Sequence, residues 1–196
     1  MATATARING IGIQYDISGA GPPILFLNGH GARARHWDRQ RRGLQPRYRV
    51  ITFDDRTAAS SPVLTEPVYP VPQMADDAIA LLDHLGIERA HLVGPSTGSL
   101  VAQEIALRHA GRVRSLTLAS AWPHPGPLGQ ITQPALVLAA AEDTLPPPRV
   151  SLELARALPN ARFEWMPGGS RFIAEYSDRF NEALLGFLDW LGAASA

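Results

Sequence analysis

The sequence predicts an α/β fold, a mainly parallel, twisted sheet with helices on both faces, in a single domain spanning residues 1–196. Short continuous apolar runs, typical of strands buried on both faces, alternate along the chain with amphipathic helical segments. Glycine-rich turns follow several of the apolar runs, and no internal repeat or interdomain linker interrupts the alternation. These observations favour one layered α/β domain.

The first elements form a predicted β-hairpin. Asn9-Gly10 lies between Ile8 and Ile11, and a two-residue turn of this kind needs a positive φ at both central residues. Alternating apolar residues then predict a return strand over residues 11–17. We therefore expect an antiparallel hairpin ahead of the parallel part of the sheet.

The remaining elements follow from apolar runs and helical periodicity. The expected strands are residues 24–27, 48–53, 91–93, 115–119, 135–140 and 162–166. The expected helices are residues 37–44, 74–85, 100–108, 149–158 and 178–191. Residues 57–72 and 122–134 are rich in proline and small residues, which predicts irregular connections. In such a sheet, ligands bind at the carboxyl ends of the strands.

Composition excludes several classes of function. The formal net charge is zero, so the charge balance favours neither nucleic acid nor an anionic membrane as a partner. All 18 basic residues are arginine, which excludes a lysine nucleophile, and the absence of cysteine excludes disulfides and thiolate chemistry. No clustered His, Asp and Glu spacing predicts a metal, and we expect no cofactor. The apolar runs are too short for a membrane span and no signal peptide is evident, so we expect a cytoplasmic protein.

Residues 94–98, Gly-Pro-Ser-Thr-Gly, fit the G-x-S-x-G turn between a strand and a helix. A strand that reverses directly into a helix brings backbone against backbone, and only glycine leaves room there. Such a turn holds its serine, here Ser96, in a strained conformation with the hydroxyl above the sheet edge. The N-terminus of the helix supplies N–H groups suited to a developing oxyanion.

The order of these segments resembles the α/β-hydrolase fold family over nearly the whole chain. The matching segments are residues 27–30 (the oxyanion loop), 50–56 (the fourth strand), 75–87 (the helix before the nucleophile strand), 94–98 (the nucleophile turn), 133–143 (the strand that ends in the acid) and 167–170 (the histidine loop). The order of the segments is more specific than any single motif.

The resemblance implies the roles of individual residues. It makes Ser96 the nucleophile and Asp143 the acid, with backbone N–H groups of Thr97 and His30 as the oxyanion hole and the His30 side chain near the pocket. It further implies a pocket for a small-molecule substrate. The expected pocket residues are Asn28, Trp37, Pro95, Trp122, His124, Leu145, Ser170 and Phe172.

Two departures from the family pattern bear on activity. The position of the catalytic histidine holds Ser170, and none of the six histidines follows His124. The usual order of serine, acid and histidine therefore cannot be completed within one chain. Second, only residues 122–134 separate two strands between which many relatives insert a helical cap, so we expect no cap domain and an open pocket. An open rim allows a homodimer in which the partner covers the pocket or contributes a histidine.

Three functions are compatible with this pattern. The first is hydrolysis of a small ester, lactone or thioester through Ser96, with a displaced histidine, His30 or His124, as the base. The second is a non-hydrolytic reaction, catalysed by a cyclase, lyase or isomerase, in which Ser96 and backbone donors polarise a carbonyl while Asp143 or His30 moves a proton. The third is a catalytically inactive pseudo-hydrolase. The missing base argues against the first, because loss of a triad histidine costs about 10⁶ in turnover.

Overall fold

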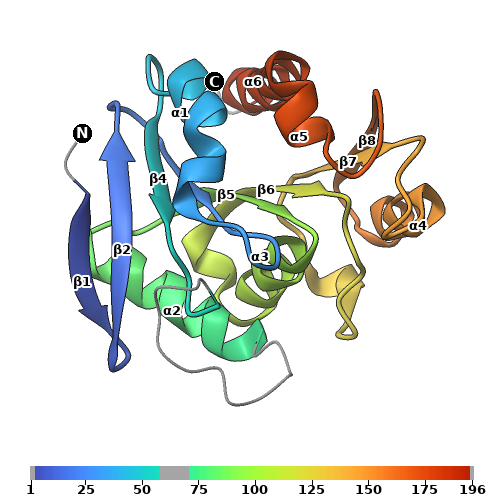
Figure 1. The fold of residues 1–196 in the computed structure, drawn as a ribbon. Helices are drawn as coiled ribbons and strands as arrows, with labels where there is room; N and C mark the ends of the chain where they lie inside the picture. Colours follow the sequence, from blue (N-terminus) through green and yellow to red (C-terminus); the bar gives the residue numbers. More distant parts are fainter. Residues whose placement is uncertain (1–2, 58–70, 195–196) are drawn as a thin grey trace.

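The computed structural model describes residues 3–57 and 71–194, which form an eight-stranded sheet between two layers of helices (Figure 1). The strands are β1 (Ala4–Ile8), β2 (Ile11–Ser18), β3 (Pro23–Phe26), β4 (Arg49–Phe53), β5 (Ala90–Pro95), β6 (Val113–Ala119), β7 (Ala135–Ala140) and β8 (Ala161–Met166). Their order across the sheet is β1-β2-β4-β3-β5-β6-β7-β8. The α/β fold expected from the sequence is confirmed.

The N-terminal hairpin forms as predicted. Ile8 pairs with Ile11, which leaves Asn9 and Gly10 as a two-residue turn with φ values of 47° and 85°. Strand β2 pairs antiparallel with β1 and with β4, whereas all the other neighbouring strands run parallel. The chain thus joins an antiparallel edge to a parallel sheet.

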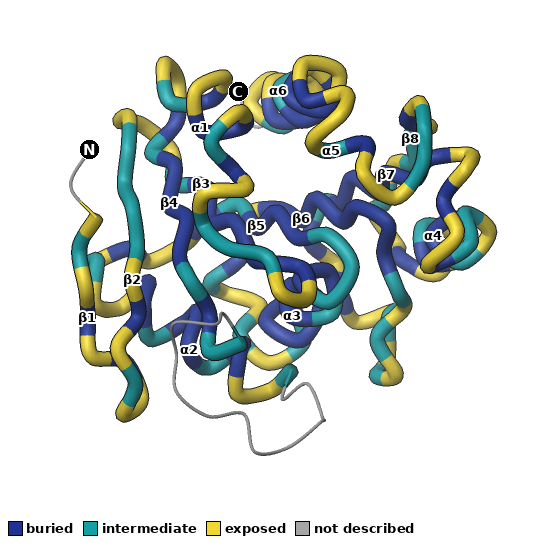
Figure 2. The backbone as a smooth tube through the Cα atoms, in the orientation of Figure 1, coloured by how far each residue is buried: buried dark blue, intermediate teal, exposed yellow. Residues whose placement is uncertain are grey.

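Helices cover both faces of the sheet. They are α1 (Asp38–Leu44), α2 (Val71–His84), α3 (Thr97–Arg108), α4 (Pro148–Ala157), α5 (Phe172–Glu175) and α6 (Ser177–Ala194), with 3₁₀ turns η1 (Ala34–Trp37), η2 (Ala110–Arg112) and η3 (Leu128–Gln130). Apolar side chains of α2, α3 and α4 pack in one core cluster, and those of α1, α5 and α6 pack in the other. The buried central strands β3, β5, β6 and β7 lie between the two layers (Figure 2).

Some boundaries differ from those expected. Helix α2 begins at Val71, three residues before the predicted start, because Pro72 is tolerated in a first turn whose N–H groups have no helical partner. Most of the predicted irregular connection, residues 58–70, lies outside the described residues. Helix α6 begins at Ser177 and is preceded by the single turn α5.

The connection at the expected cap position is short. Residues 120–134 join β6 to β7, all of them are described, and their one regular element is η3. No cap domain is inserted there, as expected from the sequence. Within residues 3–57 and 71–194, no helix combines the length and the apolar character needed to cross a membrane.

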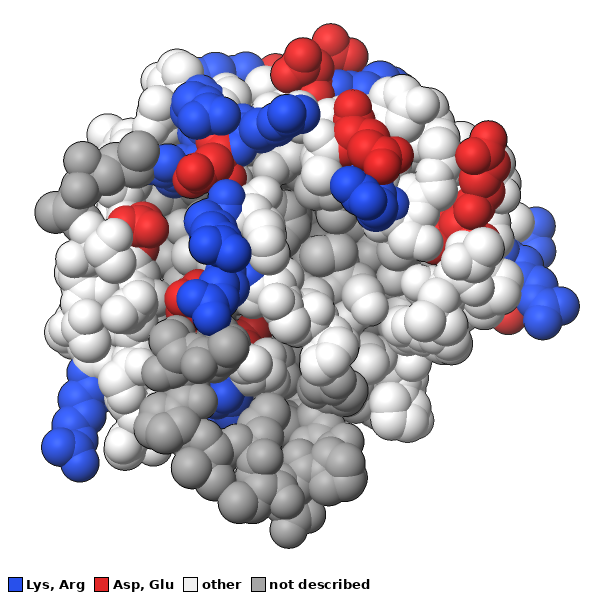
Figure 3. Space-filling view, viewed as in Figure 1, with Lys and Arg blue, Asp and Glu red and all other residues white. Residues whose placement is uncertain are grey.

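The charged side chains are interspersed on the face shown in Figure 3, where arginines lie beside acidic residues. Several of the exposed arginines form ion pairs, such as Arg108 with Asp76 and Arg171 with Glu175. The distribution gives no broad surface of one sign on this face.

Candidate active site

The turn at Ser96 has the geometry of a strained nucleophile turn. Ser96 lies between β5 and α3 with φ 49° and ψ −117°, a conformation that residues with a side chain rarely adopt. Its N–H donates to the Ala119 carbonyl of β6 at 3.0 Å. Its carbonyl accepts from the Ser99 N–H at 3.0 Å and from Ser99 Oγ at 2.5 Å. The backbone is therefore held on both sides of the serine.

Both glycines of the turn are sterically required. A Cβ atom on Gly94 would lie 2.3 Å from the Gly98 carbonyl oxygen. A Cβ atom on Gly98 would lie 2.6 Å from the Leu27 carbonyl oxygen and 2.8 Å from that of Asn28. The second glycine thus brings the start of α3 against the chain that leaves β3, where the sequence places the oxyanion loop.

The predicted acid is buried and bonded to serines. Asp143 follows β7 and is 5% exposed. Ser170 Oγ donates to Asp143 Oδ1 at 2.7 Å, and Ser120 Oγ donates to Asp143 Oδ2 at 2.5 Å. The Leu145 N–H also donates to Oδ1, at 3.2 Å. Ser170, at the position expected for a histidine, makes a hydrogen bond to the acid without supplying an imidazole.

Ser120 is a site residue that the sequence did not identify. It directly follows β6, has a φ of 43°, and donates its N–H to the Leu138 carbonyl at 2.9 Å. The sequence could have indicated Ser120 by its position at the carboxyl end of the predicted strand 115–119, the next strand after the Ser96 turn. Its bond to Asp143 depends on how β6 and β7 pair, which the local sequence does not reveal.

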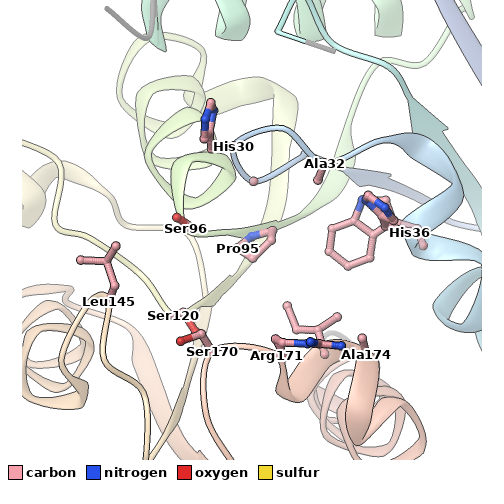
Figure 4. A pocket seen from close by; sticks show the side chains of 13 residues that line it. His30, Ala32, His36, Pro95, Ser96, Ser120, Leu145, Ser170, Arg171 and Ala174 are labelled. Carbon is pink, nitrogen blue, oxygen red and sulfur yellow. The ribbon is translucent and has the colours of Figure 1, made fainter. Parts of the chain in front are cut away.

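A cavity of about 350 Å³ lies above these residues. The residues lining it are Gly29, His30, Ala32, His36, Trp37, Pro95, Ser96, Ser120, Leu145, Ser170, Arg171, Ile173 and Ala174. Ser96 lies on one side of the hollow, and Ser120 and Ser170 lie together on the other (Figure 4). Asp143 is not part of the lining and lies behind the two serines that bond to it.

The Asn28 side chain holds the chain after β3 in place through two hydrogen bonds. Its side-chain Nδ2 donates to the Phe53 carbonyl at 2.7 Å, and its Oδ1 accepts from Trp37 Nε1 at 3.0 Å. Asn28 is 2% exposed and lies outside the cavity lining, whereas Trp37 lines it. These bonds tie together the ends of β3 and β4 and the indole that forms one wall.

Of the two histidines expected near the pocket, His30 lines the cavity and His124 does not. His30 lines the cavity on the loop after β3, but its ring extends away from Ser96 (Figure 4). His124 lies outside the lining. Its Nε2 is 2.8 Å from Glu104 Oε2, and its Nδ1 accepts the Gly126 N–H at 2.9 Å. Both ring nitrogens of His124 are therefore engaged away from Ser96.

Two other expected pocket residues lie outside the lining. Phe172 is fully buried and packs against Phe180, with 6.3 Å between ring centroids. Trp122 precedes η3, and its carbonyl accepts from Gln103 Nε2 at 2.9 Å. Pro95 and Leu145 do line the cavity, together with Ser96, Trp37 and Ser170.

His36 lines the cavity although the sequence suggested no role for it. Its ring is exposed, and its Nδ1 accepts the Arg33 N–H at 3.0 Å. Among residues 3–57 and 71–194, no three His, Asp or Glu side chains come together as a possible metal site. The cavity thus has a strained serine at mostly apolar walls, and the buried carboxylate lies behind two of its lining serines.

The comparisons with known proteins agree with this geometry. The family model described as "alpha/beta hydrolase fold" matches residues 22–128, more than half of the chain. RutD of Caulobacter vibrioides, whose name proposes a carbamate hydrolase, is 26% identical over 257 residues, covering 91% of this chain and 96% of that protein. RutD of a Caulobacter species is 34% identical over 122 residues, covering 59% of this chain and 45% of that protein.

Solved structures share the fold. An enol-lactonase from Burkholderia xenovorans superposes with a TM-score of 0.88 at 22% identity, covering 95% of this chain and all of that one. A hydrolase from Pseudomonas aeruginosa gives the same TM-score at 23% identity, covering 95% and 98% of the two chains. With the Ser96 turn, the buried acid and the sheet order, these matches show that the chain belongs to the α/β hydrolase fold family.

Proposed function

We propose that this protein cleaves the acyl bond of a small ester, lactone or thioester, with Ser96 as the nucleophile. The observation that carries the proposal is the strained Ser96 backbone, with φ 49° and ψ −117°, at the wall of a cavity. Strained backbone of this kind clusters at active sites and ligand-binding sites, which supports a chemical role for Ser96. The names of these two relatives refer to related groups, because a carbamate and an enol lactone each have a carbonyl carbon bonded to a heteroatom.

In the proposed reaction Ser96 Oγ attacks the carbonyl carbon, and the carbonyl π electrons move to oxygen. The N–H groups of Thr97, the first residue of α3, and of His30 hold this oxyanion. The first N–H groups of a helix have no partner within the helix, so they are available to an anion. We assign His30 only this backbone role, since its ring extends away from Ser96.

The general base is the unusual part of this site. Residue 170 is a serine, whose neutral hydroxyl is a weak proton acceptor, and Asp143 lies behind the cavity lining. An oxyanion hole and substrate binding alone sustain about 10³–10⁴-fold acceleration over water. The protein on its own should therefore acylate Ser96 slowly compared with a complete triad.

Labelling with a fluorophosphonate tests the nucleophile. We expect one phosphonyl adduct on Ser96, located by intact mass and peptide mapping, and none on the Ser96→Ala variant. Ser18→Ala is the matched control, because Ser18 lies at the end of β2 and outside the cavity. A folded protein that forms no adduct after long incubation would exclude Ser96 as the nucleophile.

A second candidate function is binding without turnover. It is favoured by one observation, that both carboxylate oxygens of Asp143 are occupied by serine hydroxyls. A pseudo-hydrolase would bind the same small acyl compounds, and Ser96→Ala would leave their Kd unchanged. Calorimetric titration of both proteins beside the labelling experiment distinguishes the two functions.

The open rim also allows a homodimer that covers the pocket. Leu145 lines the cavity and is 68% exposed, so a second copy would remove an apolar side chain from water. Light scattering that gives only the monomer mass across a wide concentration range would exclude this assembly.

A further inference from the structure

Two hydroxyls in the cavity are limited to accepting hydrogen bonds from a ligand. Ser120 and Ser170 line the cavity, and each donates to Asp143, at 2.5 Å and 2.7 Å. A hydroxyl has a single proton, and an ionised carboxylate only accepts. The two serine oxygens therefore offer only lone pairs to the cavity, and a group bound beside them must donate an N–H or O–H.

The charge behind the serines favours a nitrogen donor. Asp143 is 5% exposed, and no ion pair between the described residues includes it. Buried carboxylates are usually paired with a group of positive charge or partial charge. The Arg171 side chain also lines the cavity, but it is 82% exposed and paired with Glu175 at 3.3 Å, so its charge has little effect on the choice of ligand. A base with a polar N–H therefore fits the site beside the two serines.

On the opposite side of the cavity, a bound group must accept a proton. Ser96 faces Ser120 and Ser170 across the cavity (Figure 4), and its hydroxyl needs a proton acceptor to become an effective nucleophile. A nitrogen base with an N–H on one side and a lone pair on the other meets both requirements. It donates to the serine oxygens that bond to Asp143 and accepts the proton of Ser96.

We propose that the cavity contains a subsite for a neutral nitrogen base of the imidazole type, which arrives as part of the substrate or as a separate small molecule. This inference rests on the proposed function of Ser96. The cavity volume of about 350 Å³ falls within the range of small-ligand pockets, so an acyl group and a five-membered ring fit together. Trp37, Leu145 and Ile173 supply apolar walls for the ring.

The proton balance of the step is complete. The bound base takes the proton of Ser96 Oγ–H as Oγ bonds to the carbonyl carbon and the oxyanion forms. Collapse of the oxyanion breaks the bond to the leaving group, which takes the proton from the protonated base. Water then attacks the acyl-serine, and the same base removes and returns its proton.

The first test measures phosphonylation of Ser96 by a fluorophosphonate at increasing imidazole concentrations. The Ser96–phosphorus bond forms, the phosphorus–fluorine bond breaks, and the base takes the proton. We expect at least a tenfold acceleration that saturates, because a bound base fills a finite site. 1-Methylimidazole has no N–H, so it should give a smaller increase without saturation. Ser18→Ala should respond as the wild type does, and Ser96→Ala should form no adduct.

Two results separate this inference from the proposed function. The Ser170→His variant places an imidazole on the chain itself. If that variant is labelled rapidly while imidazole does not accelerate the wild type, or does so linearly and equally with 1-methylimidazole, the subsite is excluded and the nucleophile stands. If neither folded protein is labelled at Ser96 under any condition, the proposed function fails, and the subsite fails with it.

A matched pair of esters identifies the source of the base. The 3-(imidazol-4-yl)propanoyl and 3-phenylpropanoyl esters of one alcohol differ in the aromatic ring, which carries a basic nitrogen and an N–H only in the first. A base supplied by the substrate predicts at least tenfold faster hydrolysis of the first without added imidazole, measured above the Ser96→Ala background. A separate base predicts equal slow rates that added imidazole raises for both. Equal rates that imidazole leaves unchanged would overturn the proposal.

Discussion

Ser170→His should convert this site into a complete serine hydrolase triad. Asp143 Oδ1 already lies 2.7 Å from Ser170 Oγ, and Ser120 holds Oδ2 at 2.5 Å, so the carboxylate is oriented before the substitution. The new imidazole can donate to Oδ1 with one nitrogen and reach toward Ser96 across the hollow with the other. Residue 170 is exposed at the cavity edge, which leaves room for the larger side chain.

The cost of the missing base sets the upper limit of the expected gain. Loss of a triad histidine lowers turnover by about 10⁶, or about 8 kcal/mol of transition-state stabilisation. A positioned general base contributes about 10²–10⁴-fold, so we expect hydrolysis of a simple aryl ester to rise by about that factor. The rate should rise with pH as the imidazole loses its proton, at a pKa above the ordinary value of about 6.5 because the Asp143 carboxylate stabilises the protonated form.

The assay compares three folded variants by steady-state hydrolysis of the same ester. Ser170→Asn is the matched control, because its amide can donate to Asp143 but takes up no proton. Ser96→Ala combined with Ser170→His reports any hydrolysis by the new imidazole alone. If Ser170→His is no faster than Ser170→Asn, then Ser96, Asp143 and residue 170 do not have the arrangement of a catalytic triad, and the reasoning is refuted.

Three further predictions concern stability. Gly98→Ala should lower the free energy of unfolding by about 2 kcal/mol or more, because the new Cβ would lie 2.6 Å from the Leu27 carbonyl oxygen. The control Gly186→Ala, in open space on α6, should instead raise the free energy of unfolding by about 0.5–1 kcal/mol. Equal effects of the two substitutions in chemical denaturation would contradict the packing argument. Burial, reinforced by Arg114 and Arg89, lowers the pKa of His91 to about 4, so the unfolded chain binds more protons between about pH 6.5 and 4, and stability should fall by about 3 kcal/mol as the pH falls through that window. His91→Asn should remove this part of the pH dependence, and parallel curves for the two proteins would refute the assignment. Arg56→Met should lower the free energy of unfolding by about 3 kcal/mol, because it leaves Asp77, which is 1% exposed, without the guanidinium 2.7 Å away. The control Arg47→Met, at the exposed pair with Asp189, should leave the melting temperature almost unchanged, and equal shifts for the two variants in thermal melts would contradict the argument.

The nucleophile turn could be predicted because its constraints are local. Gly94 and Gly98 are dictated by contacts within one strand, turn and helix, so five residues were enough to indicate a strained Ser96. The hairpin at Asn9-Gly10 followed for the same reason, since its positive φ values belong to the turn itself. The parallel sheet followed from apolar runs whose burial on both faces requires covering helices.

The contacts of the histidines could not be predicted. His124 and Glu104 are 20 residues apart, and their bond forms only because α3 and the connection after β6 pack together. His36 lines the cavity because η1 lies beside the oxyanion loop, an arrangement that periodicity does not encode. The expected pocket residues Phe172 and Trp122 fell outside the lining, because Phe172 packs against Phe180 of α6 and the Trp122 backbone is held by Gln103 of α3.

By itself the sequence determined which chemical groups are present and in what order: a serine in a G-x-S-x-G turn, an acid after a later strand, and no histidine beyond His124. Only the tertiary structure decided what takes the place of the absent imidazole. Ser120 and Ser170 meet at one carboxylate because three loops converge at the carboxyl edge of the sheet. A hydrogen bond between residues 23 or 27 positions apart depends on strand pairing, and strand pairing is a property of the whole fold.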